Sequence, residues 1–178
     1  MDEKSRDDGT ASDVSEEAAR RAIDAALNFL SYRQRTGREV RRKLVERGFS
    51  ADVIEAALAR LAAVHLVDDE AFVGAYVRDR IAHRPMGVRR MIQELYQKGI
   101  TREVALPVIQ EVLREEETDE RALAERVVEK KRHTLKSRTQ DERVLRRRLR
   151  DHLIRRGFET RVANDVVDAL FPRNDAEG

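Results

Sequence analysis

The chain has 178 residues, of which 40% are hydrophobic and 39% are charged, and it contains no cysteine. Disulfide bonds and cysteine-ligated zinc are therefore excluded. Prolines are few, and the abundant Ala, Leu, Glu and Arg are typical of helical proteins. No apolar run approaches the roughly 18–20 residues that a membrane span requires. We expect an all-α, soluble cytoplasmic protein that does not bind membranes.

The first segment, residues 1–17, carries seven acidic residues against Lys4 and Arg6. Its one large apolar residue after Met1 is Val14, so it buries too little surface to offset the conformational entropy lost on ordering. We therefore predict a disordered acidic N-terminal tail at 1–17. Residues 172–178 are predicted to form a short polar C-terminal tail.

One sequence pattern occurs three times between these tails: an amphipathic helix ends at a glycine, and an apolar residue follows. The three copies align on Gly48, Gly99 and Gly157, at spacings of 51 and 58 residues, which leaves room for about three helices per copy. The aligned apolar positions include Val40/Met91/Leu149 and Leu44/Leu95/Leu153. We predict three tandem three-helix repeats at 18–66, 67–117 and 118–171, stacked into an elongated, curved, solenoid-like body.

In the first repeat, the opening helix is predicted to bury an apolar stripe formed by Ile23, Leu27 and Leu30. The second helix begins at the turn 35–37 and ends at Gly48, because glycine adopts the left-handed conformation at a helix end without a Cβ clash. Ser50 is the expected N-cap of the third helix.

The second repeat begins at Asp68, Asp69 and Glu70. A helix cap by Asp68 or Asp69 is the favoured interpretation, and a metal site is the alternative. Thr101 repeats the capping position of Ser50. Pro107 lacks a backbone donor, so the third helix of this repeat either kinks there or starts later than its counterpart.

The third repeat is basic. Residues 130–161 contain thirteen Lys and Arg against four Asp and Glu, an excess that favours a polyanionic or acidic partner over an ordinary solvated helix face. Helical spacing allows Arg143, Arg146, Arg147 and Arg150 to share one stripe. The predicted binding residues are Lys130, Lys131, Arg132, Arg143, Arg146, Arg147, Arg150, Arg155 and Arg156. Few aromatic residues lie here, which argues against base stacking.

Catalytic chemistry is not indicated. The glycines lie singly, so no phosphate-binding glycine loop is present, and no serine or thiol occupies a nucleophile setting. The four histidines are scattered without metal-ligand spacing. We predict a protein that is not an enzyme and that has no catalytic residues, metal site or cofactor.

At this point the residues resemble the RecX family of bacterial recombination regulators. The similarity is most specific at 67–72, 87–95 and 98–100, and it extends over about residues 20–171. We interpret the family-like positions as caps, core residues and helix stops: Gly48, Asp68, Asp69, Phe72, Gly87, Leu95, Lys98, Gly99 and Gly157. The acidic segment before residue 18 and Pro107 depart from the family pattern.

The resemblance implies three tandem three-helix repeats and a non-enzymatic modulator of the RecA recombinase. Such a protein binds the RecA nucleoprotein filament, suppresses its ATPase, strand-exchange and coprotease functions, and binds single- or double-stranded DNA. We expect a monomer with RecA and DNA as partners. Two other functions remain open at this point: a helix-turn-helix-like transcription regulator and a helical protein-interaction scaffold.

Overall fold

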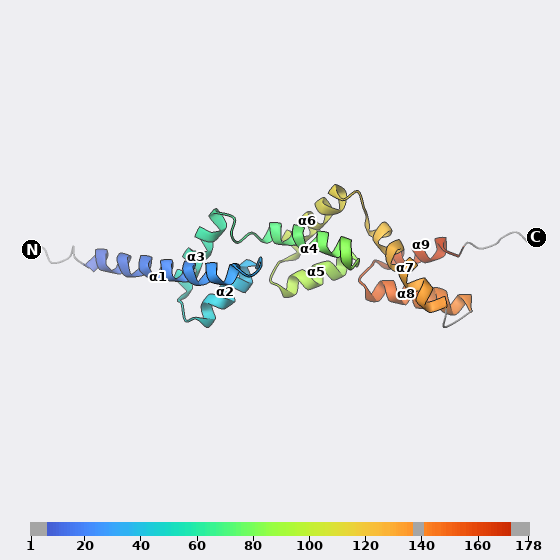
Figure 1. Ribbon diagram of the computed structural model, residues 1–178, viewed down its shortest axis with the longest axis horizontal. Helices are drawn as coiled ribbons and strands as arrows, with labels where there is room; N and C mark the ends of the chain where they lie inside the picture. The colour runs from blue at the N-terminus through green and yellow to red at the C-terminus, as the bar shows by residue number, and fades with distance from the viewer. Residues whose placement is uncertain (1–6, 137–140, 172–178) are drawn as a thin grey trace, which may run out of the picture. The chain divides into compact units, whose positions relative to one another are not determined.

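The computed structural model describes the backbone of residues 7–136 and 141–171. Within these ranges it contains nine α-helices and no strand (Figure 1), which confirms the predicted all-α class. None of the helices in these ranges is both long enough and apolar enough to cross a bilayer.

The helices follow one another in three groups of three, as the tandem-repeat prediction requires. They are α1 (Asp7–Leu30), α2 (Gly37–Glu46), α3 (Ala51–Ala63), α4 (Asp69–His83), α5 (Val88–Gln97), α6 (Arg102–Glu115), α7 (Glu120–Lys136), α8 (Glu142–Arg155) and α9 (Thr160–Ala169). Helices α1, α2 and α3 pack on one another, as do α7, α8 and α9, and α5 packs on α6.

The contacts divide the chain into two compact units whose boundary falls inside the second repeat. One unit contains the residues up to Phe72 together with the turn Lys98–Ile100, and the other contains Val73–Gln97 and the residues from Thr101 onward. The first turn of α4 and the turn after α5 therefore belong with the first repeat.

Helix α1 buries alanine rather than the predicted stripe of large residues. Ala22 and Ala26 are fully buried against α2 and α3, whereas Leu27 is 39% exposed. Ile23 and Leu30 are only partly buried against this core. The prediction is wrong for Leu27 because it selected large side chains, while small ones allow close helix packing.

The predicted disorder of residues 1–17 is wrong for residues 7–17, which form the first part of α1. Glu16 accepts hydrogen bonds from both terminal nitrogens of Arg60, at 3.0 and 2.7 Å. The bonds from Arg60 lower the pKa of Glu16. Composition does not reveal this pairing, because Arg60 lies 44 residues away. Residues 1–6 and the predicted C-terminal tail at 172–178 lie outside the described residues.

The starts of α3 and α6 agree with the predicted positions, but the expected side-chain capping bonds are not formed. Ser50 and Thr101 stand at the N-caps of α3 and α6, but neither side chain makes a capping hydrogen bond. Helix α2 has a fuller cap: the Thr36 hydroxyl accepts from the Glu39 N–H, and the Glu39 carboxylate accepts from the Thr36 N–H.

The positions of Asp68 and Pro107 can be compared with the expectations for the second repeat. Asp68 caps α4, since its carboxylate accepts from the Ala71 N–H at 2.8 Å. Among the described residues no group of three His, Asp or Glu is placed to hold a metal ion. Pro107 lies inside α6, so the later start of that helix is wrong. Both Pro107 and Glu103 are exposed, and water can reach the Glu103 carbonyl that the proline leaves unpaired.

The start of α2 is bonded to the second repeat at two points. The Gly37 N–H donates to Asp69 Oδ1 at 2.9 Å, and the Thr36 hydroxyl donates to the Lys98 carbonyl at 2.8 Å. Thr36 is fully buried, which shields its bond from water. These bonds explain why the turn after α5 belongs to the first unit.

The start of α5 is bonded to the third repeat in the same way. The Val88 N–H donates to Glu120 Oε1 at 3.2 Å, and the Gly87 N–H donates to the Arg156 carbonyl at 3.0 Å. Burial raises the pKa of Glu120 while the Val88 N–H opposes that rise. We call these two sets of bonds the first and second repeat junctions.

The two junctions use equivalent repeat positions. In each, the donor amide belongs to the first residue of a middle helix, and the acceptor carboxylate belongs to the first residue of the next opening helix. The carbonyl acceptor immediately precedes the next aligned glycine. One difference is that the position occupied by Thr36 in the first junction is occupied by Gly87 in the second. A Cβ at Gly87 would overlap the backbone of Gly157, so the missing side chain allows a direct backbone hydrogen bond.

The other family-like positions are structural. Leu95 is fully buried and Phe72 nearly so. The Lys98 ammonium lies 5.7 Å from the centre of the Phe72 ring, within the range of a cation–π contact. These positions fix the core and the turn after α5 rather than present side chains to a ligand.

The aligned glycines Gly48, Gly99 and Gly157 all have positive φ, at 81°, 91° and 84°. Around Gly48 a Cβ would meet nothing within 4 Å. At Gly99 it would lie 2.5 Å from Arg38 Cβ, and at Gly157 it would lie 2.6 Å from the backbone nitrogen of Arg90. Gly99 and Gly157 therefore have two roles: they adopt the left-handed conformation of the turn, and their lack of a side chain lets the preceding repeat approach closely.

This double role predicts a graded stability series. Gly48→Ala should cost about 1–2 kcal/mol from the left-handed backbone alone. Gly99→Ala and Gly157→Ala should cost more, with Gly157→Ala the worst because its neighbour is backbone rather than side chain. Urea unfolding followed by circular dichroism measures the three losses, and equal losses would contradict a role for close approach at the junctions.

Candidate functional site

The four arginines predicted to form a stripe along α8 differ in exposure, because Arg146 and Arg150 are partly buried. Arg150 pairs with Asp168 on α9, and the Arg146 guanidinium donates to the Phe171 carbonyl. The Arg146 guanidinium also lies 5.2 Å from the centre of the Phe171 ring, and that of Arg132 lies 5.9 Å from it. These three arginines hold the end of the third repeat together.

The other two members of the stripe are exposed. Arg143 makes no side-chain bond to the described residues, and Arg147, with 85% of its side chain exposed, reaches Asp151 at only 4.0 Å. An ion pair this exposed contributes little to stability. Arg143 and Arg147 are thus exposed, whereas Arg146 and Arg150 are bonded within the third repeat.

Three of the predicted residues, Lys130, Lys131 and Arg156, line a groove of about 1110 Å³ in the second unit. Its walls come from the end of α4, from α7 and from the end of α8. Arg155, at the last position of α8, lines a separate hollow beside Lys131. We call the larger cavity the basic groove.

The basic groove contains residues that the sequence analysis missed. Arg84 and His83 come from the end of α4 and the residue after it, and Arg126 comes from α7. They lie outside the basic run at 130–161, and the fold alone brings them to it. The one available signal was the turn Arg84-Pro85-Met86-Gly87, which interrupts the chain where the groove forms.

The charge of the groove is strongly positive. Its ionisable lining consists of five Arg or Lys, two His and one acid: Arg84, Arg126, Lys130, Lys131, Arg156, His83, His152 and Glu129. Burial lowers the pKa of His152 to about 4, and the charges of Arg156, Lys131 and Arg155 lower it further. His152 is therefore neutral near pH 7.

This lining suits a phosphate backbone. Lysine and arginine neutralise phosphates without reading base sequence, and the lining contains no Phe, Tyr or Trp ring on which a base could stack. The residues present can bind and orient a polyanion.

A second surface feature recurs in all three repeats. Val45, Tyr96 and Ile154 occupy the same position, directly after the buried leucine of each middle helix. They are 59%, 66% and 42% exposed. Each repeat therefore presents one exposed apolar side chain at the same position.

Comparison with known proteins places this architecture in context. Profiles described as the first, second and third three-helix domains of RecX match residues 22–61, 68–106 and 118–167. A regulatory protein RecX from Prosthecochloris aestuarii is 32% identical over 158 residues, which are 89% of this chain and 99% of the relative. The regulatory protein RecX of Mycobacterium avium is 37% identical over 160 residues, covering 89% and 88% of the two chains.

Solved structures show the same fold. The crystal structure of RecX from Lactobacillus salivarius superposes with a TM-score of 0.75 at 21% identity, covering 87% of this chain and 97% of that one. A second crystal structure, of a regulatory protein RecX, has a TM-score of 0.73 at 26% identity and covers 94% and 78% of the two chains.

The depressed pKa of His152 predicts a pH dependence of stability. The unfolded chain takes up this proton near its ordinary pKa of 6.5, whereas the folded chain does so only near 4. The contribution of His152 to the free energy of unfolding is therefore fully present above about pH 6.5, and it is lost as the pH drops from 6.5 toward 4. In His152→Gln, which lacks the imidazole, this loss of stability between pH 6.5 and 4 should be absent.

Melting temperatures of the parent protein and of His152→Gln between pH 7.5 and 4.5 measure the effect. His83→Gln is the matched control, because His83 lines the same groove from its exposed rim. If the melting temperatures of parent and His152→Gln fall in parallel, burial and the neighbouring cations do not keep His152 neutral.

Proposed function

Because the chain belongs to the RecX family of regulatory proteins, we propose that it regulates the RecA recombinase by binding the RecA–DNA filament. In this proposal it lowers the ATPase, strand-exchange and coprotease activities of the filament without catalysing a reaction itself. The observation that carries the proposal is the match to regulatory RecX proteins along nearly their whole length.

The basic groove supports the DNA part of the proposal. It concentrates five Arg or Lys side chains around one acid within a single unit of the chain. Phosphate contacts made by such side chains give strong, salt-dependent affinity with little sequence preference. A regulator that must act on filaments of any sequence needs this kind of contact.

The repeated apolar residues support the protein part. RecA in a filament presents the same surface many times, and this chain presents Val45, Tyr96 and Ile154 at the same position of three repeats. Exposed aromatic and aliphatic side chains are the usual anchors of protein interfaces. We propose that Tyr96, the largest of the three, contacts RecA.

Co-sedimentation with RecA assembled on single-stranded DNA tests the DNA contribution. The charge reversal Lys130→Glu/Lys131→Glu should weaken filament binding by at least about tenfold, since it replaces two attractive contacts by repulsive ones. The control Arg102→Glu/Arg114→Glu makes the same charge change on α6, outside the groove. Equal weakening by both pairs would show that net charge, not the groove, determines binding.

The apolar contact point is tested by Tyr96→Ser. This variant should weaken filament binding about tenfold or more, as expected when an interface aromatic is removed, while binding to bare DNA and the melting temperature remain unchanged. Tyr32→Ser is the control, because Tyr32 is 86% exposed but is not at the repeated position. Equal filament affinity of Tyr96→Ser and the parent would remove Tyr96 from the interface.

A further inference from the structure

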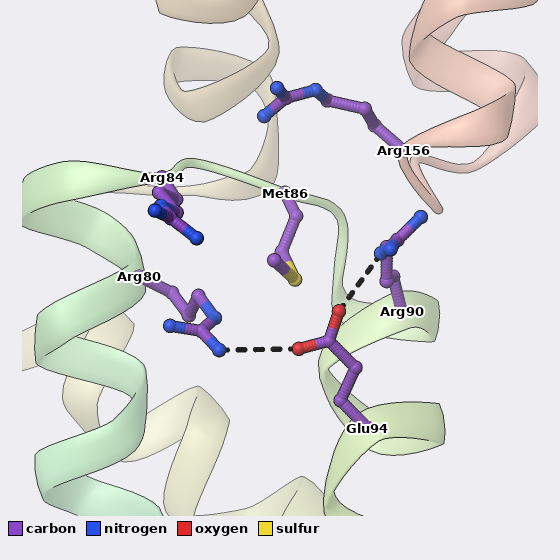
Figure 2. Close-up of a pocket in the computed structure, with 6 residues that line it drawn as sticks. All are labelled: Arg80, Arg84, Met86, Arg90, Glu94 and Arg156. Carbon is purple, nitrogen blue, oxygen red and sulfur yellow. Dashed lines mark hydrogen bonds and ion pairs between the residues drawn. The ribbon is translucent and has the colours of Figure 1, made fainter.

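A smaller cavity of about 250 Å³ adjoins the basic groove. Its lining consists of four arginines, one acid and one methionine: Arg80, Arg84, Arg90, Arg156, Glu94 and Met86. The side chains approach the cavity from the α4 side, from α5 and from the end of α8 (Figure 2). This volume lies below the range of about 300–1,000 Å³ that holds drug-sized ligands, which restricts the occupant to a small group.

The single acid of the cavity is fully engaged. Glu94 Oε1 accepts from Arg90 Nε at 3.0 Å, and Oε2 accepts from the Tyr76 hydroxyl at 2.8 Å and from Arg80 at 3.2 Å (Figure 2). Burial opposes ionisation of Glu94, but these bonds lower its pKa on balance. The Glu94 carboxylate is thus shared by Arg80 and Arg90, and Asp79 gives Arg80 a second acidic partner at 2.7 Å.

Arg84 and Arg156 are the two arginines of the cavity without an acidic partner in the described part of the chain. The Arg156 side chain donates to the Pro85 carbonyl at 2.8 Å, and no bond of the Arg84 side chain to a described residue is present. Both arginines also line the basic groove. Two uncompensated guanidinium groups therefore stand where the two cavities share a wall.

Arg156 is held in place before any ligand arrives. Its side chain is bonded to Pro85, and its backbone carbonyl accepts the Gly87 N–H of the second repeat junction. Arg84 directly precedes Pro85, and its N–H donates to the Arg80 carbonyl at 3.1 Å. The bonded Arg156 side chain loses less entropy on binding than a free one, and the planar guanidinium donors of both arginines match the oxygens of a phosphate.

We propose that Arg84 and Arg156 together hold one phosphodiester group of a DNA strand, whose next phosphates follow Lys130 and Lys131 along the basic groove. This inference rests on the proposed DNA contact and makes it specific: it names one phosphate site and places a residue of the second repeat in it.

Fluorescence anisotropy with a labelled single-stranded oligothymidylate tests the proposal on the full chain. Arg84→Gln should raise the Kd about three- to tenfold and reduce the slope of log Kd against log salt by about 0.7, the value for one phosphate contact on a single strand. Its melting temperature should not change, because the Arg84 side chain makes no bond to the described residues.

The matched control is Arg102→Gln. Arg102 is an exposed arginine of the same unit that lines neither cavity, so the slope should not change. The same affinity and slope for Arg84→Gln and Arg102→Gln would overturn the proposal.

Competition by inorganic phosphate at constant ionic strength separates two phosphate sources. If phosphate displaces DNA from the parent protein no better than chloride does, the strand is the ligand, whereas strong displacement that Arg84→Gln abolishes identifies a free-phosphate site and overturns the strand assignment.

The RecA assay separates this inference from the proposed function. If the parent protein binds filaments and Arg84→Gln binds bare DNA as the parent does, the phosphate site is wrong and the regulatory function stands. If the parent protein does not bind filaments while Arg84→Gln still loses DNA affinity, the regulatory function is wrong and the phosphate site stands.

Discussion

The backbone N–H groups at the start of a helix have no acceptor within that helix. In this protein the first of them, at the start of α2 and again at α5, donates to a carboxylate that begins the next repeat. Each junction thereby satisfies an orphan donor with a negative charge at the positive end of a helix dipole. The repeats are joined by groups that an isolated repeat would leave unsatisfied, which explains why the first compact unit takes in parts of the second repeat.

The junction also sets the position of the candidate binding groups. At the second junction the Arg156 carbonyl accepts the Gly87 N–H, while the Arg156 side chain reaches the wall between the basic groove and the smaller cavity. Gly87 makes this approach possible because it has no side chain. The same few residues therefore connect two repeats and orient the Arg156 guanidinium that we assign to a phosphate. A change in the second repeat junction would therefore move a side chain of the basic groove.

The sequence predicts those features that depend on neighbours along the chain. The aligned glycines, the cap by Asp68 and the repeat period are local patterns, and the structure agrees with them. The capping box of Thr36 and Glu39 was also visible as a Thr-x-x-Glu pattern, but it was missed. In the second repeat, the helix runs through Pro107 because the affected carbonyl is exposed, which a propensity argument does not include.

Features that depend on contacts distant in the sequence could not be predicted. The helix from Asp7 includes Glu16, whose partner Arg60 lies in α3. The arginines of α8 divide into structural and exposed ones because Asp168 of α9 pairs with Arg150 and the Phe171 carbonyl, beyond α9, accepts from Arg146. Arg84 lies far from the basic run and becomes part of the groove only through folding. A charge count therefore selected the basic third repeat and only part of the lining of the basic groove.

The most direct test of the account is the single-stranded-DNA-dependent ATPase of the cognate RecA, titrated with this protein at fixed DNA and RecA concentrations. The account predicts inhibition by the parent protein that persists in excess DNA, and a weaker inhibition by Lys130→Glu/Lys131→Glu. Unchanged ATPase at every ratio, or inhibition that excess DNA abolishes, would contradict a regulator that acts on the RecA filament.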